Sequence, residues 1–331
     1  MDTKLQAPVA GSVSGVNRSR RAAIGLGAAW ALMTVAACTP SPTRRSTISA
    51  ATGGLLSPVR SISGARLLLQ TNQSGMPTTR QPGSFGGMTP LVFPVAVAVS
   101  MLDVFIADAG AGRLYRYDPT LDAMAIIAGA TVNPQTRLAA GPDGSVLVTT
   151  PGAGMPLRFD RAGNPLQRVN AQTGSDHYDD VVIDPETGRF LALDRIQRRL
   201  DEVSPVGHRG IVLADRQLPD APVAIAMDRR KLYVSGRHCS CVVAIDPLTG
   251  RQATVIEDLK DVGALAAGGG WLVVADSVQR HLFVHRDGML RGEPSFEALK
   301  LANPQGMAIF NDSLYVADGS GRRIAVFRLS P

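Results

Sequence analysis

The chain has 331 residues, of which 45% are hydrophobic and 19% are charged, a composition that supports one large folded domain or two medium ones. The net charge of +6 falls to about +3 without the first 37 residues. So mild an excess disfavours a nucleic-acid-binding protein, which needs a concentrated basic surface. Aromatic residues are sparse, and the β-branched residues among the apolar ones favour strands.

Residues 1–37 are expected to be an export signal. Three arginines, Arg18, Arg20 and Arg21, precede sixteen uncharged residues, fewer than the ~20 that a membrane-spanning helix needs. This stretch ends in the sequence VAAC at Cys38, which resembles the lipobox of bacterial lipoproteins. The resemblance implies cleavage before Cys38, lipidation of its thiol and tethering of the mature chain to a membrane surface.

Residues 38–64 are expected to be a flexible linker, because Ser, Thr, Pro and Gly dominate and no apolar period is sustained. Thr39 follows the cysteine in place of the Asp that commonly retains lipoproteins in the inner membrane. We therefore expect an anchor in the outer membrane of the cell envelope, with the domain facing the periplasm or the cell surface.

One motif then recurs along the rest of the chain. After each apolar triplet stand Asp108, Thr150, Asp194, Gly236, Asp276 and Asp318, at intervals of 40 to 44 residues. Five residues further on stand Arg113, Met155, Arg199, Cys241, His281 and Arg323. A short apolar strand precedes each copy and an alternating apolar run follows it. Such a period of short strands predicts the blades of a β-propeller, which bury their faces against one another.

The last copy stops after its third strand, at the end of the chain. Ala65 to Asn72 reads as an isolated strand before the first blade. We therefore predict an all-β, six-bladed β-propeller over residues 65–331, in which this N-terminal strand completes the last blade and removes its open edge.

The amino-acid pattern of the repeat also resembles that of a known family. Asn303 to Phe327, "NPQGMAIFNDSLYVADGSGRRIAVF", is similar to the NHL repeat, and residues 93–118 and 264–285 follow it well. The resemblance is partial or weak in the copies where Thr150 and Gly236 replace the Asp. It implies a six-bladed propeller that covers the whole mature domain.

The recurring charged residues are expected to be structural. Each Asp should cap a turn and pair with backbone N–H groups or with the following Arg. A catalytic group is needed once, whereas these groups recur in nearly every blade. They are Asp108, Asp194, Asp276 and Asp318, with Arg113, Arg199 and Arg323.

Residues that break the repeat are better candidates for a binding site. The turns between second and third strands should share one face with the loops that lead into the blades. This rim would carry Arg195, Arg198, Arg237, His238, Gln279, Arg280 and Arg322. It suits an anionic or hydrogen-bonding partner, although ordinary solvated loop charges would look the same. His177 and Asp180 are expected at the mouth of the central channel.

Cys239 and Cys241 are the remaining cysteines in what should be an oxidising compartment. Three alternatives stay open: a disulfide, two unbonded thiols, or a Zn or Cu site with His238, since thiolate and imidazole suit soft metals. A tetrahedral metal site normally needs four ligands, so we expect no required metal or cofactor.

These features predict a membrane-anchored, non-catalytic binding or scaffold protein of the bacterial cell envelope, whose partner is an envelope protein or a polysaccharide. The alternative is a hydrolase or lyase acting on a small envelope or periplasmic substrate, because some similar six-bladed propellers are metal-dependent lactonases or lyases. A catalytic metal site requires three or more convergent donor groups. The expected innermost strands offer few beyond Asp180, Asp184 and the nearby His177.

Overall fold

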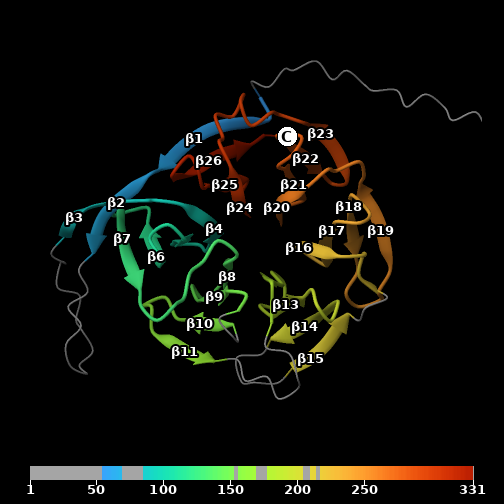
Figure 1. Ribbon diagram of the computed structural model, residues 1–331, viewed down its shortest axis with the longest axis horizontal. Coiled ribbons are helices and arrows are strands. Elements are labelled where there is room, and N and C mark those ends of the chain that lie inside the picture. Colours follow the sequence, from blue (N-terminus) through green and yellow to red (C-terminus); the bar gives the residue numbers. More distant parts are fainter. Residues whose placement is uncertain are drawn as a thin grey trace, which may run out of the picture. The chain divides into compact units, whose positions relative to one another are not determined.

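The structure is a computed structural model, and its secondary-structure elements are strands. It describes residues 54–68, 85–152, 156–168, 177–203, 209–213 and 217–330. The expected signal sequence, Cys38 and Met155 lie outside these ranges. Within the described part, the strands form six sheets arranged around a central axis (Figure 1). The prediction of an all-β, six-bladed propeller is thereby confirmed.

The blades are numbered here along the chain, and their strands are given from the channel outward; all strand pairs within them are antiparallel except β2 with β7 in blade 1. Blade 1 contains β4 (Pro94–Val99), β5 (Val104–Asp108), β6 (Arg113–Asp118), β7 (Ala123–Ile127), β2 (Gly64–Leu68) and β3 (Phe85–Pro90). Blade 2 contains β8 (Arg137–Ala140), β9 (Val146–Thr149), β10 (Leu157–Phe159) and β11 (Pro165–Arg168). Blade 3 contains β12 (Asp180–Ile183), β13 (Phe190–Asp194), β14 (Arg199–Val203) and β15 (Arg209–Leu213).

The second half of the ring follows the same order. Blade 4 contains β16 (Pro222–Asp228), β17 (Lys231–Gly236), β18 (Cys241–Ile245) and β19 (Gln252–Ile256). Blade 5 contains β20 (Val262–Gly268), β21 (Trp271–Asp276), β22 (His281–Arg286) and β23 (Met289–Gly292). Blade 6 contains β24 (Pro304–Phe310), β25 (Ser313–Asp318), β26 (Arg323–Leu329) and β1 (Leu56–Ile62).

The closing strand comes from an earlier part of the chain than the sequence suggested. β1 pairs antiparallel with β26, with Leu56 opposite Leu329 and Ile62 opposite Ile324. The expectation that Ala65–Asn72 completes blade 6 was wrong, since β2 instead joins the outer edge of blade 1, parallel to β7. Only Leu56 and Ile62 of β1 are buried, so the apolar pattern of this strand was too sparse to distinguish it from a linker.

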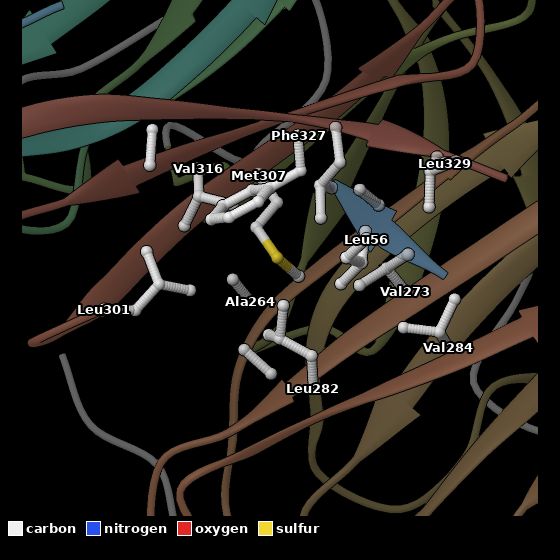
Figure 2. Packing of buried hydrophobic residues seen from close by; sticks show 14 of the residues in the cluster. Leu56, Ala264, Val273, Leu282, Val284, Leu301, Met307, Val316, Phe327 and Leu329 are labelled. Atoms are coloured by element: carbon white, nitrogen blue, oxygen red, sulfur yellow. The ribbon is translucent and has the colours of Figure 1, made fainter. Parts of the chain in front are cut away.

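Burial on both sheet faces explains the apolar runs of the repeat. Every residue of β5, β13 and β21 is buried, as expected for strands covered on both sides. Six buried apolar clusters lie between successive blades, one for each contact around the ring. Figure 2 shows the cluster between blades 5 and 6, where Leu56 packs with Val273, Met307 and Phe327.

The two ends of the ring lie together. Ser330 N donates to the carbonyl of Leu55 at 3.0 Å, and Leu329 N donates to the carbonyl of Asp312 at 2.8 Å. Asp312 belongs to the turn between β24 and β25. The N-terminal segment therefore joins the ring at the face that carries the turns between first and second strands, called the bottom face below.

Closure by β1 can be tested on that strand itself. We expect Ile62→Ala to lower the free energy of unfolding by about 2–4 kcal/mol, because Ile62 is 3% exposed and packs between blades 6 and 1. Val59→Ala, on the same strand at a side chain that is 56% exposed, should change it by less than about 0.5 kcal/mol. Denaturant unfolding of both variants measures the difference, and equal losses would contradict the proposed role of β1.

Candidate functional site

The repeated aspartates organise the face opposite the N-terminal attachment. This top face is defined by the loops that lead into the innermost strands and by the turns between second and third strands. Asp108 accepts hydrogen bonds from Val92 N at 2.7 Å and Phe93 N at 2.8 Å in the leading loop. It also accepts one from Ala111 N at 3.1 Å in the turn. One buried carboxylate thus ties the two top segments of its blade together.

Blades 5 and 6 repeat this arrangement. Asp318 accepts from Asn303 N at 2.7 Å and from Arg323 Nε at 3.3 Å. Asp276 accepts from Lys260 N at 2.6 Å and Gln279 N at 2.8 Å. Burial alone would raise the pKa of Asp276, but these N–H donors hold it below its usual value. Asp194 accepts from Gln197 N at 2.8 Å, so all four aspartates occupy a structural position.

The arginine that stands five residues after the repeated Asp has a different partner in different blades. Arg323 forms an ion pair with Asp318 at 3.3 Å, and Arg199 forms one with Asp201 at 3.1 Å. Arg113 interacts with the hydroxyl of Tyr115. Blade 2 uses a hydroxyl pair where the Asp is missing, because Thr150 Oγ1 lies 2.9 Å from Thr136 Oγ1.

The structure brings the expected rim residues to the top face but uses several of them internally. Arg198 pairs with Asp220 at 2.7 Å, and Arg195 pairs with Asp179 at 3.8 Å. The Gln279 amide donates to the Asp258 carbonyl and to Asp276, both at 3.0 Å. These three side chains help to hold the face together.

The remaining rim residues are more available. Arg237, His238 and Arg322 are exposed, and within the part of the chain that the structure describes their side chains make no hydrogen bond or ion pair. Arg280 is exposed too and lies over the ring of Phe296, 5.5 Å from its centroid. The cationic part of the rim therefore lies over blades 4, 5 and 6.

Sequence reasoning missed an apolar component of the same face. Ile196 and Val278 are 77% and 66% exposed, and each stands two residues after the repeated Asp. His238 occupies that position in blade 4, between them. A comparison of the residues at this position in all blades would have identified these two side chains, because blades 1 and 2 have the glycines Gly110 and Gly152 there.

A third feature is backbone geometry at the turn position four residues after the repeated Asp. Arg198, Arg280 and Arg322 stand there with φ angles of 47°, 57° and 53°, a left-handed conformation that favours glycine. Blade 1 has Gly112 at this position with φ of 62°. The turn therefore does not itself require an arginine.

The channel supplies a separate cavity of about 160 Å³, lined by all six innermost strands. Its lining is mainly Ala, Val, Leu, Ile and Met, with Arg137, Asp180 and Gln305 as its polar side chains near the starts of their strands. Asp180 is buried and accepts from Ile225 N at 2.8 Å and Val181 N at 2.9 Å. Burial raises its pKa to about 6, although Arg137 and the N–H donors act in the opposite direction. His177 is exposed nearby in sequence.

The donor set does not match a lactonase-like metal site. Among the described residues, no group of three or more His, Cys, Asp or Glu side chains could hold a metal ion. Cys239 and Cys241 form a disulfide, so their sulfurs cannot act as thiolate ligands beside His238 in this state. The described residues also contain no helix long and apolar enough to cross a membrane.

Comparisons with known proteins support the fold. No family model and no curated protein matches the chain. Among solved structures, a streptogramin B lyase matches with a TM-score of 0.53 and 12% identity, covering 73% of this chain and 95% of the lyase. A chain from the structure of a nidogen–laminin complex matches with a TM-score of 0.52 and 16% identity; the match covers 72% of this chain and 91% of the matched chain. At these identities the matches show that the fold is shared.

The raised pKa of Asp180 predicts a distinctive pH dependence. An unfolded Asp has a pKa near ~3.9, so the native state binds this proton more tightly between about pH 4 and 6, and stability falls as pH rises through that window. Relative to Asp180→Asn, the wild-type chain should lose up to about 3 kcal/mol of unfolding free energy between pH 4 and 7. Denaturant unfolding at several pH values measures this difference; a difference that stays constant or rises would contradict the assignment.

Proposed function

We propose that the chain is a lipid-anchored, NHL-like propeller of the bacterial cell envelope that acts as a non-catalytic binding module. Its top face over blades 3 to 6 captures an envelope protein. Cys38 carries the lipid, and the linker that follows it in the sequence leads to β1.

The observation that carries this proposal is the set of exposed arginines in left-handed turns. Arg280 and Arg322 occupy a conformation that costs a non-glycine residue of order 1 kcal/mol. Arg322 makes no side-chain hydrogen bond or ion pair within the described residues, so no side-chain contact there accounts for an arginine. A binding role explains why arginine stands where blade 1 has Gly112.

The composition of the face supports a protein partner. Ile196 and Val278 offer apolar contacts on either side of the cationic Arg237 and its neighbour His238. Arginine and apolar side chains together are typical of protein interfaces, in which a few anchors dominate the affinity. Because Asp220 and Asp179 are already paired with arginines, the remaining positive charge favours a partner surface that bears carboxylates.

The position of the N-terminal segment also agrees with this role. Leu55 and Leu56 join the ring beside Leu329 and the Asp312 turn, on the bottom face. A tether at Cys38 would therefore pull on the bottom of the ring. The top face lies at the opposite end of the ring from this point of attachment.

Charge reversal at two arginines tests the proposal. A photo-crosslinker at Val278 in the anchored chain should capture one dominant protein, and Arg280→Glu with Arg322→Glu should reduce that adduct at least about tenfold. The double variant Arg229→Glu with Arg251→Glu is the control: it makes the same charge change in the bottom-face turns, where both arginines are exposed. Equal adduct yields in the two double variants would contradict binding by the top face.

A companion substitution separates binding from folding. Arg322→Gly should leave the free energy of unfolding unchanged or raise it by at most about 1 kcal/mol, because glycine relieves the left-handed backbone. The same variant should lose partner capture. Thermal unfolding and the crosslink yield measure the two effects, and a clear loss of stability would show that Arg322 has a structural role instead.

The second candidate is catalysis at the mouth of the channel. Asp180, with its pKa near 6, is a plausible acid or base, and Arg137 lines the same cavity. A streptogramin B lyase shares the fold, so a lyase reaction is the first type of catalysis to test. A folded, abundant protein that captures no protein from Val278 would favour this candidate and direct substrate searches to Asp180 and His177.

A further inference from the structure

The turn between β17 and β18, residues 237–240, differs from its counterparts in how it is held. In blades 1, 5 and 6 a buried Asp joins this turn to the leading loop through backbone N–H groups. Blade 4 has Gly236 at that position, so it has no carboxylate to do this. It has a disulfide between Cys239 and Cys241 instead.

The disulfide fills the space that an aspartate would need. A Cβ atom placed on Gly236 would lie 2.8 Å from Cys239 Sγ and 3.0 Å from the carbonyl oxygen of Asp220 in the leading loop. It would also lie 2.9 Å from Pro219 Cβ, so a side chain at 236 would require the disulfide and the leading loop to shift. Glycine at 236 and the disulfide therefore belong together: where the other blades have an Asp that accepts backbone N–H bonds, blade 4 has a covalent bond that closes the turn on itself.

The two sulfurs of this bond come from residues in unlike surroundings. Cys239 is an exposed turn residue on the top face. Cys241 is 4% exposed, and it packs in the apolar cluster between blades 3 and 4 with Val234 and Leu200. An incoming group from solvent can therefore approach Cys239, whereas Cys241 is shielded by the core.

Basic side chains lie close to Cys239 on the top face. Arg237 and His238 precede it in the same exposed turn, and Lys260 lines a small depression together with Gly236, Arg237 and Ser240. Of the nearby acids, Asp220 pairs with Arg198, Asp261 lines the same depression as Lys260, and Asp258 is exposed. Positive surroundings stabilise a thiolate.

We propose that the Cys239–Cys241 disulfide is a thiol-exchange site on the top face. A thiolate forms a bond to Sγ of Cys239 while the bond between the two cysteine sulfurs breaks. The electron pair of that bond passes to Sγ of Cys241, which then takes a proton from water. The incoming sulfur is oxidised to a mixed disulfide and Cys241 is reduced, so no other oxidant is needed. Reduced Cys241 is well accommodated, because a free Cys packs as a small apolar residue.

Glutathione is the first probe. The chain carrying Cys38→Ser has Cys239 and Cys241 as its only cysteines. After incubation with reduced glutathione and acid quenching, peptide mapping should find about tenfold more glutathione on Cys239 than on Cys241. The oxidised peptide of residues 237–241, in which both sulfurs are exposed, should show no such preference. A second arm replaces glutathione with an acidic peptide that carries one cysteine, and the faster arm identifies whether a small thiol or a protein thiol is the preferred nucleophile.

Matched variants test the role of the local charge. Arg237→Glu should slow adduct formation at least about threefold, whereas Arg251→Glu, the same charge change in the exposed bottom-face turn of blade 4, should leave the rate unchanged. Equal rates would overturn the proposed electrostatic contribution, and with it this site assignment.

Two further outcomes would overturn the proposal. One is the absence of an adduct on Cys239 under conditions in which the peptide reacts. The other is a failure of the chain carrying Cys239→Ser and Cys241→Ser to fold, because the disulfide would then be a structural bond. Exchange with glutathione requires no captured protein, so this result stands apart from the test of the proposed function.

Discussion

The packing of each blade against its two neighbours is the constraint on which the rest of the structure depends. A sheet that is apolar on both faces, such as blade 3, in which every residue of the strand β13 is buried, cannot be stable alone in water. Six such sheets satisfy one another only as a closed ring, and β1 completes it by pairing with β26. Because the sheet faces are occupied in this way, the channel and the turns at the two ends are what the ring leaves for function.

At the top end, structure and binding capacity are divided between neighbouring positions. The repeated Asp, buried and surrounded by N–H donors, fixes where each turn lies. The positions two and four residues later are then free to vary: they hold glycines in blade 1 but Val278 and Arg280 in blade 5. A constant scaffold with variable tips is how repeat proteins generally acquire binding surfaces. Blade 4 departs from this division, since it has Gly236 at the Asp position and a disulfide within the turn itself.

The sequence allowed the six blades to be predicted because each repeat carries its own apolar period and its own Asp. The closing strand could not be identified, because its two buried residues, Leu56 and Ile62, lie six positions apart among Ser, Pro and Arg. Its identity depends on a partner strand almost the whole chain away. The rim was only partly predictable for a similar reason. The pairing of Arg198 with Asp220 joins two blades, and the exposure of Ile196 depends on its position in the turn rather than on its hydrophobicity.

The central claim is that one sector of the top face binds a protein, and the near-sixfold repeat allows a direct test. A photo-crosslinker can be placed, one variant at a time, at Gly110, Ile196, His238, Val278 and Ser320, which are equivalent positions of five blades. In the full-length chain we expect a single protein adduct whose yield is highest at Ile196, His238 and Val278 and lowest at Gly110. Equal yields around the ring, or adducts with many proteins, would contradict a specific binding surface over blades 3 to 6.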